Sequence, residues 1–163
     1  MFRRIFVFLF SLTCFYNTYS QNILSEQDKK SILSVMNNQE IAWNQGKIDD
    51  FMEGYIKSEN LIFNGANGPY YGWKAVKYRY FRSYPSKEKM GVLSFKVSDL
   101  FGLSSNFALM IGEYNLLYPS KCFRIFKKFK SCQDITSNGF FTLLWKKTDQ
   151  GWLILSDHTS SSN

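Results

Sequence analysis

GFFTLLWKKTDQGWLILSDHTS (residues 139–160) is the stretch that decides the fold class. Two apolar runs, residues 140–147 and 152–160, flank the polar turn Asp149-Gln150-Gly151, a pattern typical of two antiparallel strands in a hairpin. Both faces of these runs are apolar, whereas a strand with one face in water alternates between apolar and polar residues. We therefore expect the outer face of the sheet to contact a second subunit in a homodimer. A sheet curled tightly enough to cover both of its own faces is the alternative.

Further strands precede this stretch. Residues 92–97 alternate apolar and polar side chains, and residues 107–117 form another long run that is apolar on both faces. Residues 61–63 and 70–71 are short strands on either side of the turn signal Asn67-Gly68. The chain therefore contains a small hairpin and four longer antiparallel strands.

Helical spacing of apolar residues marks three other segments. The first follows the expected N-cap Ser25 and stops at Gly46, and a short second one starts at Asp49. The third spans residues 73–84, where Pro85 ends it. This order of elements predicts an α+β domain, with the helices packed on one face of a curved antiparallel sheet.

The composition indicates one globular domain. Of 163 residues, 45% are hydrophobic and 20% charged, which fits a packed core rather than disorder. The aromatic share of 18% is more than a core of this size requires, so we expect some rings to line a cavity. The net charge is +7, or +5 without Arg3 and Arg4, an excess that by itself does not indicate a nucleic-acid partner.

The first 20 residues have the pattern of a signal peptide. Arg3 and Arg4 precede an apolar run over residues 5–15, and Thr18 and Ser20 are small residues where a signal peptidase reads them. The apolar run is about half of the ~20 residues that a membrane span requires, so we expect cleavage near Ser20. A retained anchor helix is the alternative. Residues 21–163 would form the mature domain, in the periplasm or outside the cell.

Export also decides how the cysteines are interpreted. Cleavage leaves Cys122 and Cys132 as an even pair in an oxidising compartment, where a disulfide is the expected state. Their spacing does not suit zinc, and a single histidine cannot complete such a site. We therefore expect no metal and no cofactor.

Four segments together resemble a known superfamily: AWNQGKIDDFMEGY (42–55), LIFNGANGPYYGW (61–73), MGVLSF (90–95) and residues 139–160. Their order and spacing are similar to the SnoaL-like and ketosteroid-isomerase-like branch of the nuclear transport factor 2-like superfamily, and within it to exported bacterial proteins grouped as a domain of unknown function. The resemblance implies a cone-shaped sheet wrapped around three helices, with a pocket at the open end and frequent homodimers. It implies no single chemistry, because the superfamily includes isomerases, dehydratases, hydrolases, binding modules and oligomerisation domains.

One connection looks longer than the resemblance implies. The segment around residues 118–137 contains KCFRIFKKFKSC (121–132), which we interpret as a hairpin insertion in which Cys122 faces Cys132. Its basic residues are either solvated, or residues 121–130 contact anionic lipid or polysaccharide at a membrane surface.

His158 is the only histidine and lies near the end of the last strand. Strict alternation puts it on the same face as Trp152 and Ser160, with Asp157 on the opposite face unless a bulge intervenes. The resemblance places this strand end near the pocket. Three interpretations stay open: a residue that lines the pocket, a general base, or a structural residue that caps the core. Glu113, Glu40 and Asp157 are the acids that could orient the base.

Aromatic residues are better candidates than His158 for lining the pocket, although aromatic rings at helical spacing are also typical of a core. With two polar residues they form the predicted ligand-binding set: Trp43, Tyr55, Phe63, Tyr71, Trp73, Tyr80, Glu113 and Ser160. Such a pocket suits a small apolar or aromatic molecule held by a few polar groups.

We therefore expect an exported small-molecule-binding domain. The first alternative is a cofactor-free acid–base enzyme, an isomerase or hydrolase, that uses His158 with a carboxylate. The second alternative is an oligomerisation module whose cone is plugged by its own aromatic side chains. No local motif decides whether the protein is an enzyme.

Overall fold

The computed structural model describes residues 24–119 and 134–162. The expected leader, the two cysteines of the mature chain and the basic segment 121–130 lie outside these residues, so export, the disulfide and the membrane contact stay predictions. No helix in the described part is both long and apolar enough to cross a membrane.

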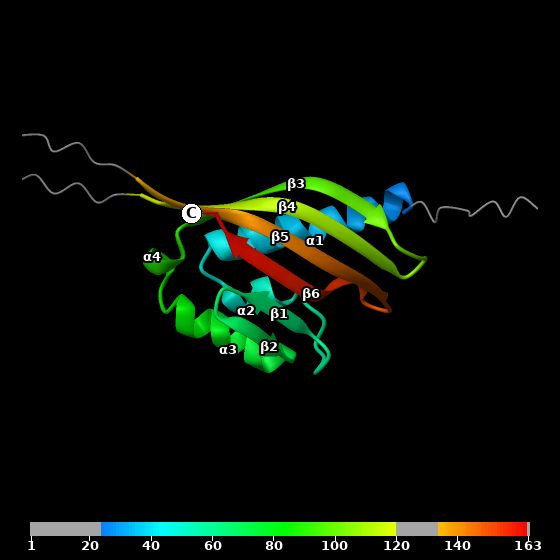
Figure 1. Cartoon of the computed structure of the whole chain (residues 1–163), viewed down its shortest axis with the longest axis horizontal. Coiled ribbons are helices and arrows are strands. Elements are labelled where there is room, and N and C mark those ends of the chain that lie inside the picture. The colour runs from blue at the N-terminus through cyan, green and yellow to red at the C-terminus, as the bar shows by residue number, and fades with distance from the viewer. Residues whose placement is uncertain (1–23, 120–133, 163) are drawn as a thin grey trace, which may run out of the picture.

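The described residues form helices and strands in the order expected from the sequence (Figure 1). Their bounds are α1 Glu26–Asn44, α2 Ile48–Met52, β1 Ile62–Gly65, β2 Gly68–Tyr71, α3 Trp73–Ser83, α4 Lys87–Met90, β3 Val92–Gly102, β4 Phe107–Tyr118, β5 Ile135–Thr148 and β6 Gly151–Ser161. The predicted α+β class is confirmed. The sequence does not predict α4, because a single turn that buries only Met90 leaves no apolar periodicity.

Helix α1 begins and ends at the residues that capping rules indicate. The Ser25 hydroxyl oxygen accepts a hydrogen bond from the Asp28 backbone nitrogen at 3.1 Å, which satisfies one of the free donors of the first turn. After Asn44 the chain passes through Gly46, whose positive φ of 76° is a conformation that residues with a Cβ adopt at a cost. These two residues fix the length of the helix that covers the sheet.

The strands form one curved sheet in the order β2-β1-β6-β5-β4-β3. Neighbouring strands are antiparallel, except that β1 runs parallel to β6. The β4–β5 ladder continues as far as the pair Tyr118 and Ile135, so this hairpin extends well beyond the start of the strand predicted from residue 140.

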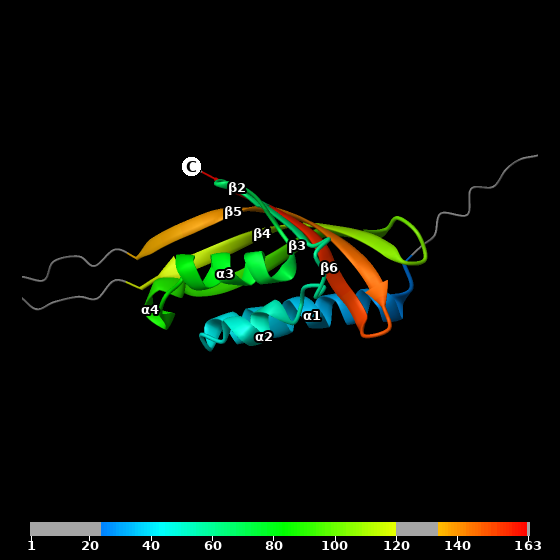
Figure 2. The same ribbon diagram turned by 90° about the horizontal axis from the view of Figure 1, so that it is seen from below.

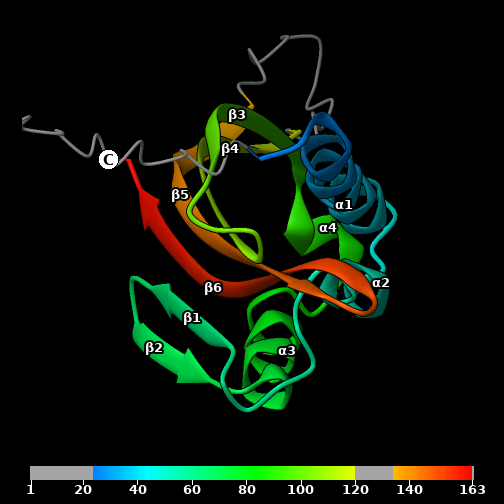
Figure 3. The same ribbon diagram turned by 90° about the vertical axis from the view of Figure 1, so that its right-hand side faces the viewer.

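The helices lie on the concave side of the sheet (Figures 2 and 3). Inward-facing residues of the long strands, such as Met110, Leu143 and Ile154, belong to one buried core with Met36 and Trp43 of α1. The outer face of the sheet carries no helix among the described residues, and apolar side chains there are partly exposed.

Strand β6 contains a β-bulge. Leu144 of β5 pairs with Ser156, and the next residue Trp145 pairs with Ile154, so Leu155 is an extra residue in β6. A residue inserted in this way reverses the alternation of the side chains that follow it.

Because of the bulge, the side chains at the end of β6 point to the faces opposite to those that strict alternation predicts. Before it, Trp152 points inward; after it, the inward residue is Asp157, which is 4% exposed. His158 is exposed on the outer face, beside Thr142 of β5. The expectation that His158 and Trp152 share a face is therefore wrong, and the bulge is the physical reason.

Candidate ligand-binding site

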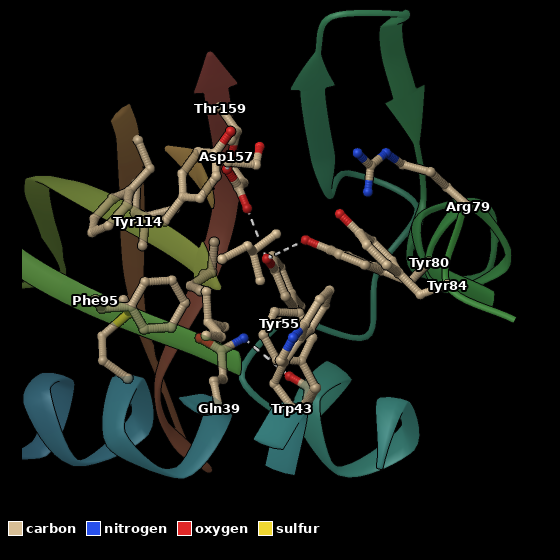
Figure 4. A pocket seen from close by; sticks show the side chains of 18 of the residues that line it. Gln39, Trp43, Tyr55, Arg79, Tyr80, Tyr84, Phe95, Tyr114, Asp157 and Thr159 are labelled. Carbon is tan, nitrogen blue, oxygen red and sulfur yellow. Dashed lines mark hydrogen bonds between the residues drawn. The ribbon is translucent and has the colours of Figure 1, made fainter. Parts of the chain in front are cut away.

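A cavity of about 170 Å³ lies between the helices and the concave face of the sheet (Figure 4). Most of its lining is apolar or aromatic and comes from the helices and strands that surround it: Met36, Gln39, Trp43, Phe51, Tyr55, Arg79, Tyr80, Tyr84, Leu93, Phe95, Tyr114, Leu116, Tyr118, Ser137, Phe141, Leu143, Ile154, Asp157 and Thr159.

The helical floor of the cavity is held by side-chain hydrogen bonds to the backbone. The buried Gln39 amide donates to the Phe51 carbonyl at 3.0 Å, and the Trp43 indole nitrogen donates to the Met90 carbonyl at 3.1 Å. Gly54 permits this packing, since a Cβ at that position would lie 2.6 Å from the Gln39 amide. The polar groups of the floor are thus used internally, and its rings are fixed in place.

The rings on the helical side pack edge to face. Trp43 lies 5.2 Å from Phe51 and 4.6 Å from Tyr84 between ring centroids, and Phe51 lies 5.1 Å from Tyr80. This geometry is the favourable one for aromatic pairs and adds about 0.5–1.5 kcal/mol per pair to the gain from burial. The aromatic wall is therefore preorganised.

One polar network crosses the cavity. The Tyr55 hydroxyl donates to Oδ2 of Asp157 at 2.7 Å, and the Thr159 hydroxyl donates to Oδ1 of the same carboxylate at 2.8 Å. The Tyr80 hydroxyl lies 3.1 Å from that of Tyr55. Because Tyr55 uses its only hydrogen on Asp157, Tyr80 is the donor in this second contact. The network therefore runs from Tyr80 through Tyr55 to the carboxylate.

Burial sets the protonation of these groups. Removal from water raises the pKa of Asp157 above its ordinary value, while the hydrogen bonds from Tyr55 and Thr159 oppose this rise. Burial, followed by the charge of Asp157, raises the pKa of Tyr55 well above its ordinary value, and burial raises that of Tyr80. Both phenols are thus protonated donors at neutral pH.

The backbone next to Tyr55 explains why it meets Asp157. The Ile154 nitrogen donates to the Gly54 carbonyl at 2.9 Å, and the Ile56 nitrogen donates to the Ile154 carbonyl at 3.0 Å. The segment after α2 therefore lies along β6, immediately before the bulge that turns Asp157 inward. Two local features of the backbone bring together residues 102 positions apart in the sequence.

A solved NTF2-like protein of unknown function from Shewanella oneidensis is 32% identical to this chain; the match covers 81% of this chain and 98% of that one, with a TM-score of 0.66. The chain belongs to the nuclear transport factor 2-like (NTF2-like) superfamily. This confirms the resemblance that the sequence indicates.

Two other solved structures show the same NTF2-like fold at low identity. One is an NTF2-like superfamily protein from Salmonella enterica, 15% identical over 84% of this chain and 92% of that one, with a TM-score of 0.63. The other is a ketosteroid isomerase-like protein from Erwinia carotovora, 12% identical over 85% of this chain and 99% of that one, with a TM-score of 0.63. No family model matches the sequence, and neither does any curated protein.

Three of the residues predicted to bind ligand line the NTF2-like cavity: Trp43, Tyr55 and Tyr80. Phe63 is buried but lies outside the lining. Trp73 is half-buried, and its indole nitrogen donates to the Met52 carbonyl at 3.1 Å.

The remaining predicted residues do not line the cavity. Tyr71 is 63% exposed on β2. Glu113 forms an ion pair with Lys96 at 3.1 Å on the outer face of the sheet, and Ser160 and His158 are exposed on that same face. Within the described residues, no group of three His, Cys, Asp or Glu side chains could hold a metal ion.

Sequence reasoning missed Gln39 and Arg79 as lining residues and expected Asp157 to point away from the cavity. Gln39 carried a usable signal, because it follows Ile32 and Met36 at helical spacing and is thus a polar residue on an apolar stripe. Asp157 carried none, since its direction depends on the bulge. Arg79 lies on a helix rich in basic residues, where nothing in the sequence distinguishes it.

Proposed function

We propose that this NTF2-like protein binds a small molecule that contains a single aromatic or similarly sized apolar ring. The observation that supports the proposal is the aromatic cavity of about 170 Å³, which has the hydrogen-bonded network of Tyr80, Tyr55 and Asp157 in its wall. An apolar cavity of about 150 Å³ is known to accept benzene, so one ring with a short substituent matches the space here.

The polar network would select the orientation of the ring. With Tyr80 donating to Tyr55 and Tyr55 to Asp157, the oxygen of Tyr80 keeps the capacity to accept one more hydrogen bond. A hydroxyl or amide N–H on the ligand is the complementary group. A few such polar contacts in an apolar pocket are the usual source of specificity.

Binding fits the geometry better than the other functions considered from the sequence. Each oxygen of Asp157 already accepts a hydrogen bond from the protein, so we assign this residue to orienting the tyrosines rather than to proton transfer. An open cavity favours binding over a cone plugged by its own side chains. We also propose that the protein acts outside the cytoplasm, which rests on the leader pattern in residues 1–20.

The test is calorimetric titration with 4-methylphenol, which has one ring and one hydroxyl. We expect a Kd of about 1 mM or tighter for such a small ligand. Ser137→Phe places a ring among the lining residues and should weaken binding by about tenfold or more, because it occupies the space the ligand needs.

Thr136→Phe is the matched control, since it adds the same ring one residue earlier, on the opposite and exposed side of β5. The affinity of this variant for 4-methylphenol should equal that of the unmodified protein. Equal binding by all three proteins would place the phenol elsewhere and contradict the proposal, as would no binding by the unmodified protein.

A further inference from the structure

Arg79 on α3 is a positive charge at the edge of the cavity that forms no direct contact with a carboxylate among the described residues. It is half-buried, lines the cavity and also borders a surface depression between α3 and β2. Among the described residues, the guanidinium forms no ion pair and donates no hydrogen bond. The charged end of this side chain is therefore available to a ligand at the cavity opening.

Aromatic rings fix the orientation of this guanidinium. Its central carbon lies 4.0 Å from the ring centroid of Phe63 and 4.9 Å from that of Tyr80. Contact through the flat face stabilises the cation and leaves the N–H groups at its edge free to donate. In Figure 4, Arg79 extends from α3 toward the space between Tyr80 and Asp157. The N–H edge is thus available to a group at the cavity opening.

The surrounding charges favour an anion at this position. Helix α3 contains basic residues and no Asp or Glu. Lys77 of this helix forms an ion pair with Asp49 of α2. Asp157 is the only carboxylate among the lining residues, and its oxygens accept hydrogen bonds from Tyr55 and Thr159. The charge of Arg79 attracts it and opposes the rise in its pKa that burial causes, but the two side chains form no ion pair, so the N–H edge of Arg79 stays open to a ligand.

We infer that the ligand is a small arylalkyl carboxylate. Its ring would lie in the cavity, where a donor group on the ring can bond Tyr80, and its carboxylate would pair with the guanidinium of Arg79. This inference rests on the proposed function and specifies the ligand class of the same site. A carboxylate matches the planar fork of a guanidinium with two parallel hydrogen bonds. One guanidinium balances a single negative charge, which favours a carboxylate over a phosphate dianion.

The test compares two probes that share a ring and chain length and differ in charge: 3-phenylpropanoate and 3-phenylpropanol. In calorimetric titrations, the unmodified protein should bind the carboxylate about ten- to a hundredfold more tightly than the alcohol, as expected for hydrogen bonds to a charged group. Arg79→Gln should reduce the affinity for the carboxylate to that for the alcohol. It should leave the affinity for the alcohol unchanged, which shows that the cavity is intact.

Two further variants test whether the effect depends on the guanidinium group and on its position. Arg79→Lys keeps the charge and loses the planar fork, so its affinity for the carboxylate should be intermediate. Lys74→Gln removes a charge from an exposed position of α3 that does not line the cavity, and both affinities should stay as they are.

The outcomes separate this inference from the function on which it rests. Equal affinity of the unmodified protein for both probes overturns the carboxylate assignment and leaves a site for neutral rings. If Arg79→Gln binds neither probe, the carboxylate assignment is also overturned, because Arg79 would then be needed for the structure of the cavity. Tighter binding of phenyl phosphate than of phenylpropanoate overturns the choice of anion. If neither these probes nor 4-methylphenol binds, the proposed function fails as well.

Discussion

Asp157 is a carboxylate in an aromatic interior, and its surroundings show how such a residue is accommodated. Its side chain accepts hydrogen bonds from Tyr55 and Thr159, and it is 4% exposed. Those bonds offset part of the cost of removing a charge from water, and the remainder appears as a raised pKa. Asp157 therefore organises the polar side of the cavity at some cost in stability.

The raised pKa of Asp157 predicts a pH-dependent cost. The folded protein binds a proton that the unfolded chain releases, so this residue lowers the free energy of unfolding as pH rises from about 4 toward its folded-state pKa. Asp157→Asn removes the titration. In urea unfolding, the free energy of unfolding of the variant relative to that of the parent should therefore increase between pH 4 and pH 8.

Both proteins in this comparison carry His158→Gln, so that no histidine charge changes beside Asp157. Asp50→Asn, at a largely exposed carboxylate, is the control for the loss of one negative charge. A flat difference for Asp157→Asn over the same range would show that the pKa of this residue is not raised.

At the scale of elements, apolar periodicity predicts most helices and strands because each buries one face against the core. Ser25 and Gly46 likewise mark the ends of α1 through local backbone chemistry. The bulge at Leu155 is different, because it depends on how β6 pairs with β5 and with the segment after α2. The pattern of a single strand does not contain information about partners so far away in the sequence. For that reason the face predicted for His158 was wrong.

The outer face of β4 and β5 keeps the apolar character that suggests a dimer. Ile111 and Phe140 are 37% and 55% exposed there, and His158 lies on the same face of β6. Exposed apolar patches of this kind commonly mark protein–protein contacts. We propose that two copies pack through this face, with His158 near the contact rather than in the cavity.

Light scattering tests this proposal. The unmodified protein should have twice the monomer mass at micromolar concentration, and the double variant Ile111→Lys, Phe140→Lys should have the mass of one chain, since charges on this face oppose packing. Tyr78→Lys, at a residue 64% exposed on α3, should stay dimeric. An unmodified protein that is monomeric under these conditions contradicts the proposal.

At the scale of the whole molecule, the cavity exists because the curved sheet and the helices meet without filling the space between them. The sequence predicted the class of fold, and three of the residues that it named, Trp43, Tyr55 and Tyr80, are among those that line the cavity. It could not supply the full lining, because these side chains converge from elements distant in the chain. Which rings face one cavity is decided by packing, and aromatic content alone does not reveal it.

The central claim is that a small ring binds in this cavity, and one measurement tests it at single-residue resolution. The protein has four tryptophans, each with one indole N–H signal in a nitrogen–proton correlation spectrum, and only Trp43 lines the cavity. Titration with 4-methylphenol should shift the Trp43 signal saturably, while the Trp73 and Trp152 signals stay in place. Trp43→Phe assigns the signal. A saturable shift at Trp73 or Trp152 with Trp43 unmoved would contradict the account, because the ring would then bind outside the cavity.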